Sequence, residues 1–273
     1  MPPPDVVVVG DVMVDVAVAA PALARGGDVH GAIRFRTGGA GANAAVWAAR
    51  AGASVRLHGR VGDDVPGAIV RGALLERGVD PALTVDPDAS TGTLLVVTEP
   101  GERSMVSDSG ANDRLSSDDL PAAIDARCVL VSGYLLLRPG SHYAARAALD
   151  RSRARRVAVD AASWPLLEAF GPERFLETAA PANLVVANDR EAEALCGARR
   201  EEAVRRLADR FGAAVVKLGP HGAAVAEGGE VAVVGSPRAE PVDVTGAGDA
   251  FDGTLLASLA AGAPLPEAAE RAA

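Results

Sequence analysis

Aromatic residues are scarce in this sequence: only 3% of its 273 residues are Phe, Trp or Tyr, whereas 49% are hydrophobic. A core with so few large rings must be filled by Ala, Val and Leu side chains packed closely between helices and a sheet. A chain of this length can bury one large α/β domain, or a core domain with a smaller appendage. The composition therefore predicts a layered α/β protein.

Cysteine is also nearly absent. Cys128 and Cys196 are the two cysteines, and neither has His or Cys at the spacing of metal ligands. We therefore expect free thiols in a reducing cytoplasm. The net charge is −9 and the arginines are scattered, so the chain offers no continuous basic face to a nucleic acid.

Long apolar runs are missing as well. No run of about 18 uncharged apolar residues occurs, so we expect no membrane-spanning helix. Residues 1–20 are apolar, as a signal peptide is, but they lack a basic start and carry Asp5, Asp11 and Asp15. We therefore expect a cytoplasmic protein whose partners are small molecules, not nucleic acid or membrane.

Short apolar runs recur along the chain and are separated by Ala-rich and Leu-rich stretches of helical character. Runs of this kind are typical of parallel strands buried on both faces. Their alternation with helices predicts a three-layer, doubly wound, mostly parallel sheet of the α/β class. The predicted core strands are 5–10, 54–57, 128–131, 156–159, 184–187 and 213–218.

Two segments depart from this alternation and predict a second, smaller sheet. Residues 12–20 and 32–37 have no helix between them, and 33–36 alternate apolar with charged side chains. Residues 91–107 form a β-branched run, a Pro-Gly turn and a second run, as in an antiparallel hairpin. We expect 12–37 and 91–107 to form a small β-sheet lid, on a core made of 1–11, 38–90 and 108–273.

The strongest motif lies late in the chain, at Asp243-Val-Thr-Gly-Ala-Gly-Asp249 before an apolar helix. Glycines at a helix start let backbone N–H groups converge on an anion, which the helix dipole also favours. We therefore predict an anion site at Gly246, Ala247 and Gly248. Asp249 can then act as a general base on a hydroxyl that attacks phosphorus. The alternative is an ordinary Gly-rich turn with an acidic residue.

A second Gly-rich turn, Gly38-Gly-Ala-Gly-Ala-Asn43, precedes a helix that ends near Gly52. Gly39 and Gly41 allow close approach, and the Asn43 amide can donate to and accept from substrate hydroxyls. Asn43 as a helix N-cap is one alternative. A dinucleotide fingerprint is another, but it requires a doubly buried strand before it, whereas 33–36 is amphipathic.

Together, the two Gly-rich motifs resemble those of the ribokinase (PfkB-type) family of carbohydrate kinases. The resemblance covers essentially the whole chain and implies an α/β core with a small β lid. It also implies transfer of the ATP γ-phosphoryl group to a primary hydroxyl of a sugar or sugar-like molecule. A nucleoside kinase on the same scaffold and a non-catalytic sugar-sensing module are the alternatives.

The resemblance implies further substrate-binding residues. Asp15 falls where the family has a carboxylate that holds sugar hydroxyls, and Asp11 also follows a core strand, where ligands of open α/β sheets bind. Arg103 on the second hairpin is predicted to close over an anionic group. Each of the three has a plainer alternative, a turn acid for the aspartates and an exposed hairpin charge for the arginine.

Nucleotide and metal sites are implied in the same way. Asn188 and Glu191 match an N-x-x-E element that organises Mg²⁺ through water, although the same pair also fits a capping box. Lys217, Gly219 and Gly222 match a loop that lines the ATP site, with a surface position as the alternative for Lys217. Asp243 and Thr245 match a K⁺ site whose other ligands, like part of the adenine pocket, are expected beyond Ala273. A homodimer through the lid is also implied.

Overall fold

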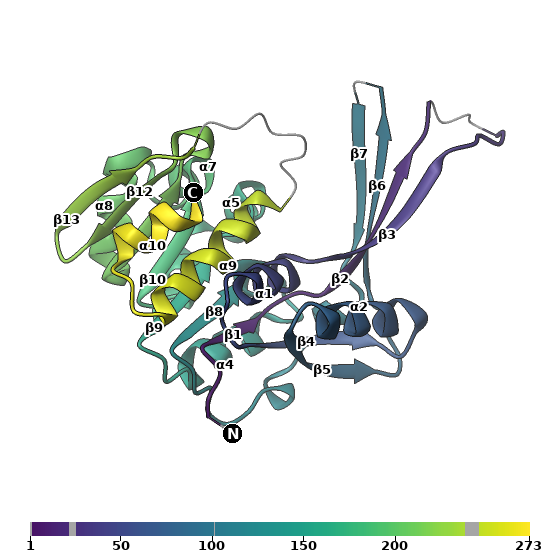
Figure 1. Cartoon of the computed structure of the whole chain (residues 1–273), viewed down its shortest axis with the longest axis horizontal. Coiled ribbons are helices and arrows are strands. Elements are labelled where there is room, and N and C mark those ends of the chain that lie inside the picture. The colour runs from purple at the N-terminus through teal and green to yellow at the C-terminus, as the bar shows by residue number, and fades with distance from the viewer. Residues whose placement is uncertain (1, 22–25, 101, 238–245) are drawn as a thin grey trace.

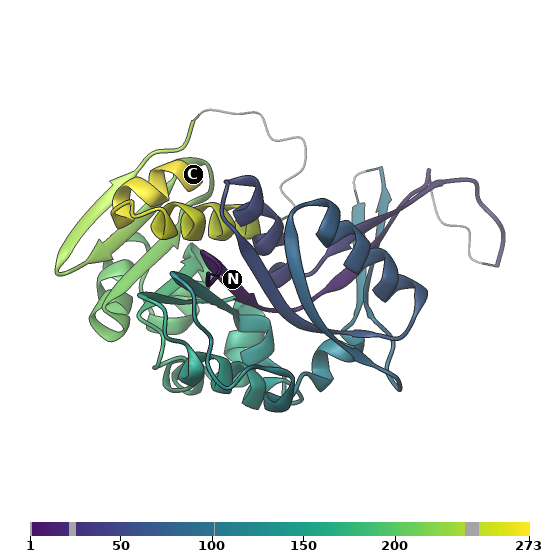
Figure 2. The ribbon, with the colours of Figure 1, turned by 60° about the horizontal axis from the view of Figure 1, so that its bottom comes forward.

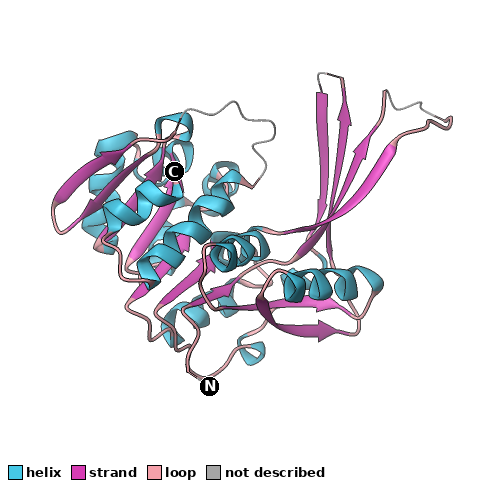
Figure 3. Ribbon diagram, in the orientation of Figure 1, coloured by secondary structure: helices cyan, strands magenta, loops and turns pink. Residues whose placement is uncertain are grey.

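The computed structural model describes residues 2–21, 26–100, 102–237 and 246–273, without the side chains of residues 102 and 103 (Figure 1). Two sheets make up its strands, one of nine strands and one of four. Helices cover both faces of the large sheet, and the small sheet projects from one end of it (Figures 1 and 3). None of the helices in these ranges has the length and apolarity to cross a membrane.

The large sheet has the order β13-β12-β11-β10-β9-β8-β1-β4-β5, and all neighbours are parallel except β11–β12 and β12–β13. This confirms the predicted doubly wound α/β class. Three strands of the sheet, β5, β12 and β13, were not predicted. The strands are β1 (Val6–Val9), β4 (Val55–Gly62), β5 (Val79–Asp86), β8 (Cys128–Ser132), β9 (Arg156–Asp160), β10 (Leu184–Asn188), β11 (Ala213–Lys217), β12 (Ala223–Glu227) and β13 (Glu230–Val234).

Two apolar clusters form the core, one on each face of the sheet. Figure 2 shows the corresponding helical layers on either side of the strands. The first layer contains α1 (Ala40–Arg50), α2 (Val65–Glu76), α9 (Ala247–Ala260) and α10 (Leu265–Ala272). The second contains α3 (Gly133–Leu137), α4 (His142–Arg151), α5 (Trp164–Phe170), α6 (Pro172–Thr178), α7 (Asp189–Cys196) and α8 (Arg200–Phe211); short 3-10 turns are η1 (Gly110–Arg114), η2 (Ser117–Asp119) and η3 (Gly219–His221).

The small sheet has the order β3-β2-β6-β7. β2–β3 and β6–β7 are antiparallel hairpins, as predicted, and the two hairpins join through the parallel pair β2–β6. On one face the Asp15 carboxyl lies against Gly38, directly before α1. On the other face, Thr37 accepts a hydrogen bond from Arg77, just after α2, at 3.4 Å. The strands are β2 (Met13–Ala19), β3 (Ala32–Gly38), β6 (Gly92–Glu99) and β7 (Glu102–Asp108).

Glycines allow α1 to pack unusually close to its neighbours. A Cβ added to Gly253 of α9 would lie 2.3 Å from the Ala44 carbonyl oxygen and 2.8 Å from the Ala48 nitrogen, both in α1. A Cβ added to Gly41 would lie 2.5 Å from the Cα of Gly10, at the end of β1. Both contacts are with backbone atoms, which cannot rotate away. The start of α1 is therefore held between α9 and the carboxyl end of β1.

Replacing Gly253 by Ala should push α1 and α9 apart. We expect the Gly253→Ala variant to lose about 1 to 3 kcal/mol of unfolding free energy, the usual cost of overpacking a close contact. Urea unfolding followed by circular dichroism measures it. The matched control is Gly72→Ala in α2, where an added Cβ meets nothing within 4 Å. This control should gain roughly 0.5 to 1 kcal/mol from the better helix propensity of Ala. Equal stability of both variants would contradict the close crossing.

Candidate active site

The two Gly-rich turns meet in space. The side-chain amide of Asn43, in the first turn of α1, donates a hydrogen bond of 2.8 Å to Oδ2 of Asp249, in the first turn of α9. Gly246 caps α9 in the left-handed conformation, with φ of 74°. The first N–H groups of α9 therefore open beside the Asp249 carboxyl, as an anion site requires. Asn43 is not the N-cap of α1, because Gly39 holds that position.

Asp11 anchors the start of α1 at the end of β1. Its buried carboxylate accepts hydrogen bonds from the backbone nitrogens of Ala40 at 3.0 Å and Gly41 at 3.4 Å. It also accepts one from the Ser132 hydroxyl at 2.9 Å. Protein donors thus occupy both carboxylate oxygens, so the geometry favours a positioning role for Asp11. The predicted contact of Asp11 with a substrate stays a prediction.

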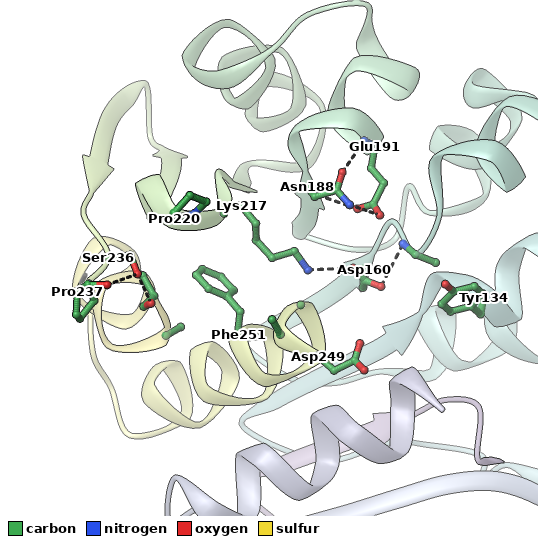
Figure 4. Close-up of a pocket in the computed structure, with 17 residues that line it drawn as sticks. Tyr134, Asp160, Asn188, Glu191, Lys217, Pro220, Ser236, Pro237, Asp249 and Phe251 are labelled. Carbon is green, nitrogen blue, oxygen red and sulfur yellow. Dashed lines mark hydrogen bonds and ion pairs between the residues drawn. The ribbon is translucent and has the colours of Figure 1, made fainter. Parts of the chain in front are cut away.

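A cavity of about 900 Å³ opens beside Asp249 (Figure 4). Its size is within the range of cofactor and ligand sites. The cavity brings together side chains that lie far apart in the sequence. Its walls include the first turn of α9, the end of β10 and the loop after β11. Among its lining residues are the predicted Ala247, Gly248, Asp249, Asn188, Glu191, Lys217, Gly219 and Gly222.

Lys217 lies in the cavity wall, not on the surface. Its ammonium donates to both carboxylate oxygens of Asp252 at 3.0 Å and lies 3.5 Å from Oδ1 of Asp160. The Lys217 side chain is only 13% exposed, so the alternative of a surface lysine is wrong. A Cβ added to Gly248 would lie 3.4 Å from Nζ. The charge of Lys217 is therefore held directly behind the predicted anion site.

Asn188 and Glu191 form a capping box at the start of α7. The Asn188 side chain accepts from the backbone nitrogens of Arg190 and Glu191, and Glu191 accepts from the Asn188 nitrogen at 2.8 Å. Both residues also line the cavity. The structural alternative for this pair is therefore correct, and it does not exclude a role at the cavity.

Burial and like charges raise the pKa values of two acids in the cavity, Asp249 and Glu191. Burial raises the pKa of Asp249 to about 7; Asp160 and Asp11 add to the rise, while Asn43 and Lys217 oppose it. Burial and the charge of Asp160 likewise raise the pKa of Glu191 to about 7. Burial acts to lower the pKa of Lys217, but the nearby carboxylates outweigh it and raise that pKa above its ordinary value. Asp249 can therefore exchange a proton near neutral pH, as a general base must.

The residues present fit a magnesium ion held mainly through water. Among the described residues, no group of three or more His, Cys, Asp or Glu side chains could hold a metal ion directly. Mg²⁺ keeps several of its waters and takes only one or two carboxylates beside substrate phosphates. Glu191 and Asp160 supply such carboxylates at the cavity wall (Figure 4).

Some predicted residues are not among the described residues that line this cavity. Asp15 lies on the small sheet against Gly38, on the side where α1 begins. Arg103 lies on β7, but its side chain is outside the part of the chain that the structure describes. Asp243 and Thr245 are outside it altogether, so the K⁺ site stays a prediction.

Asp160, Tyr134 and Phe251 in the cavity wall, and Asp252 behind it, are among the residues that were missed from the sequence. Asp160 ends β9 and Tyr134 follows β8, so the rule that ligands bind at the carboxyl ends of parallel strands pointed to both. Phe251, in the cavity wall, and Asp252, behind it, lie inside the apolar part of α9. No sequence signal separated them from core positions.

The chain matches known proteins along its length. It fits the description "pfkB family carbohydrate kinase" over residues 3–273. The aminoimidazole riboside kinase of Salmonella typhimurium is 32% identical over 238 residues, which cover 81% of this chain and 73% of that protein. The ribokinase of Mus musculus is 30% identical over 270 residues, or 93% of this chain and 81% of that protein.

Solved structures agree with this similarity. The adenosine kinase from Sinorhizobium meliloti has a TM-score of 0.87 at 25% identity, over 99% of this chain and 92% of that chain. The aminoimidazole riboside kinase from Salmonella enterica, solved with aminoimidazole riboside and an ATP analog, has a TM-score of 0.81 at 26% identity. That similarity covers 98% of this chain and 90% of the solved chain. Because the family match extends over residues 3–273, the chain belongs to the pfkB family of carbohydrate kinases and is a sugar or nucleoside kinase.

Proposed function

We propose that this protein transfers the γ-phosphoryl group of ATP to a primary hydroxyl of a sugar or riboside, with Asp249 as the general base. The observation that carries the proposal is the hydrogen bond from Asn43 to Asp249, which joins the N-terminal turns of α1 and α9. It supports the proposal because it brings the Asn43 amide of α1 to the Asp249 carboxyl in the first turn of α9.

The reaction follows from this arrangement. Asp249 accepts the proton of the substrate hydroxyl while its oxygen forms a bond to the γ-phosphorus. The bond from that phosphorus to the β,γ-bridging oxygen breaks, and ADP leaves with the electron pair. The N–H groups of residues 246–248 stabilise the negative charge on the transferring group. The acceptor is held by Asn43, Gly39, Gly41 and Asp15, and ATP occupies the cavity between Asn188 and Gly219.

Magnesium is proposed to lie near Glu191 and Asn188, where it would neutralise the phosphates of ATP. Glu191 would hold it through water, in keeping with its two hydrogen bonds to Asn188. The protein's part is to fix the position of this carboxylate. The capping box does so by tying Glu191 to the end of β10.

The small sheet is proposed to act as a lid that excludes water from the transferring phosphoryl group. Its Asp15 face is on the side where α1 begins, next to Gly38. On the face of the small sheet opposite to Asp15, the apolar side chains of Ile33, Phe35 and Val106 are exposed. They would supply surface for the predicted homodimer.

Relatives that act on ribose and on ribosides support both a sugar and a nucleoside as the acceptor. The accumulation of acids with raised pKa values speaks against a non-catalytic module.

Replacing Asp249 by Asn should remove the base while keeping the hydrogen bond to Asn43. We expect turnover to fall by roughly 10² to 10⁴ with little change in KM, since proton transfer contributes about that factor. Coupled-enzyme assays with ribose, aminoimidazole riboside and adenosine as acceptors measure it. Unchanged thermal unfolding is the control, and turnover close to that of the unsubstituted protein would refute the assignment.

The base also predicts a pH dependence. Asp249 accepts a proton only when ionised, and its pKa is about 7. In the unsubstituted protein, kcat/KM for the acceptor should therefore rise with pH below about 7, tenfold per unit, and level off above it. An acid limb centred near pH 4, the ordinary range for Asp, would contradict the raised pKa of this carboxyl.

Glu191→Gln tests the magnesium proposal. Gln can still serve in a capping box, so α7 should keep its start. The loss of charge should weaken the apparent affinity for Mg²⁺ by about 10-fold to 100-fold, as changes around a metal site commonly do. Titration of MgCl₂ at fixed ATP measures it, and an unchanged Mg²⁺ midpoint would exclude Glu191 from the metal site.

A further inference from the structure

A buried ion pair lies directly behind the catalytic turn. Lys217 reaches in from the end of β11, and Asp252 lies one turn after Asp249 on α9. Asp252 is 3% exposed, and both of its oxygens accept from the Lys217 ammonium at 3.0 Å. Two accepting oxygens fit an ionised carboxylate, so the pair consists of an ammonium and a carboxylate.

Lys217 is the counterion in an acidic site. Of the described residues that line the cavity, Lys217 alone is basic, whereas Asp160, Glu191 and Asp249 are acidic. Ion pairs this deeply buried are costly, because desolvation of both charges opposes their attraction. Replacing such pairs by apolar side chains of similar volume is often neutral or stabilising. A function that needs the charge explains the pair better than stability does.

The backbone brings that charge close to the base. Gly248 precedes Asp249, and a Cβ added to it would lie 3.4 Å from the Lys217 nitrogen. The ammonium therefore lies against the same helical turn that carries Asp249. The ammonium also lies 3.5 Å from Oδ1 of Asp160. Two carboxylates thus hold the ammonium of Lys217, which fixes its charge in place.

We propose that the Lys217 ammonium, held against the anion-binding turn by Asp252 and Asp160, is the positive charge that keeps Asp249 ionised for proton abstraction. The inference rests on the proposed function of Asp249. Several groups face Asp249 or its partners, and each contributes to its charge state. They are Asn43 on α1, Asp11 after β1, Tyr134 on α3, Asp160 on β9, Glu191 on α7, Lys217 on β11 and Asp252 on α9.

The test is a ¹³C NMR titration of the Asp249 carboxyl in protein without nucleotide or metal, assigned by its absence from Asp249→Asn. In Lys217→Met the loss of an attracting cation should raise the titration midpoint by about one pH unit. In Asp252→Asn the loss of an anion should lower the midpoint, because the Asn oxygen and Asp160 still hold Lys217. Lys217→Arg, which keeps the charge, should leave the midpoint near that of the unsubstituted protein.

The pH dependence of kcat/KM is then measured for the same variants. The pH at which kcat/KM falls on the acid side should rise in Lys217→Met and drop in Asp252→Asn. Lys217→Met leaves two buried acids unpaired, so thermal unfolding checks its fold. If it does not fold, the double variant Lys217→Met/Asp252→Asn replaces it, and its midpoint should lie above that of Asp252→Asn. Midpoints that stay in place would overturn the inference. Midpoints that move while the acid limb stays would overturn Asp249 as the base, and with it the proposed function.

Discussion

The hydrogen bond between Asn43 and Asp249 is the contact on which the site depends, because it joins two helix N-termini from opposite ends of the chain. Two features of the surrounding packing hold these termini together. Gly253 lets α9 approach the backbone of α1, and Asp11 ties the start of α1 to β1. Without that close approach, the anion site of one helix and the amide of the other would open into different regions. The fold therefore matters to function through the position of two helical turns.

The electrostatic design of the cavity follows from its excess of acids. A carboxylate that stayed fully ionised at a helix N-terminus would repel phosphate, whereas a neutral one could not act as a base. Burial together with Asp160 and Asp11 raises the pKa of Asp249, and Asn43 and Lys217 limit that rise. The outcome is a carboxyl that titrates near the pH at which it must work. Bound cations and nucleotide phosphates would add to this balance, so the charge of each wall residue affects the others.

Much of this architecture could be predicted from the sequence. The apolar runs predicted six of the parallel strands, and the two hairpins predicted the small sheet. Strand β5 was missed because Pro81 and two aspartates interrupt its apolar pattern, and β12 and β13 because short runs of Ala and Val resemble helix as much as strand. Within the site, the Gly-rich turns were visible because glycine and charged residues seldom cluster by chance. Asp252 was not, because only the three-dimensional position of Lys217 gives that carboxylate a partner.

The central claim is that donor and acceptor meet between the two Gly-rich turns, at Asp249. A crystal structure of the protein with an acceptor sugar or riboside and a non-hydrolysable ATP analogue tests it most directly. The account predicts the acceptor hydroxyl about 3 Å from a carboxylate oxygen of Asp249, in line with the γ-phosphorus, which itself lies over residues 246–248. An acceptor hydroxyl bound beyond reach of Asp249, or phosphates placed away from the start of α9, would contradict it.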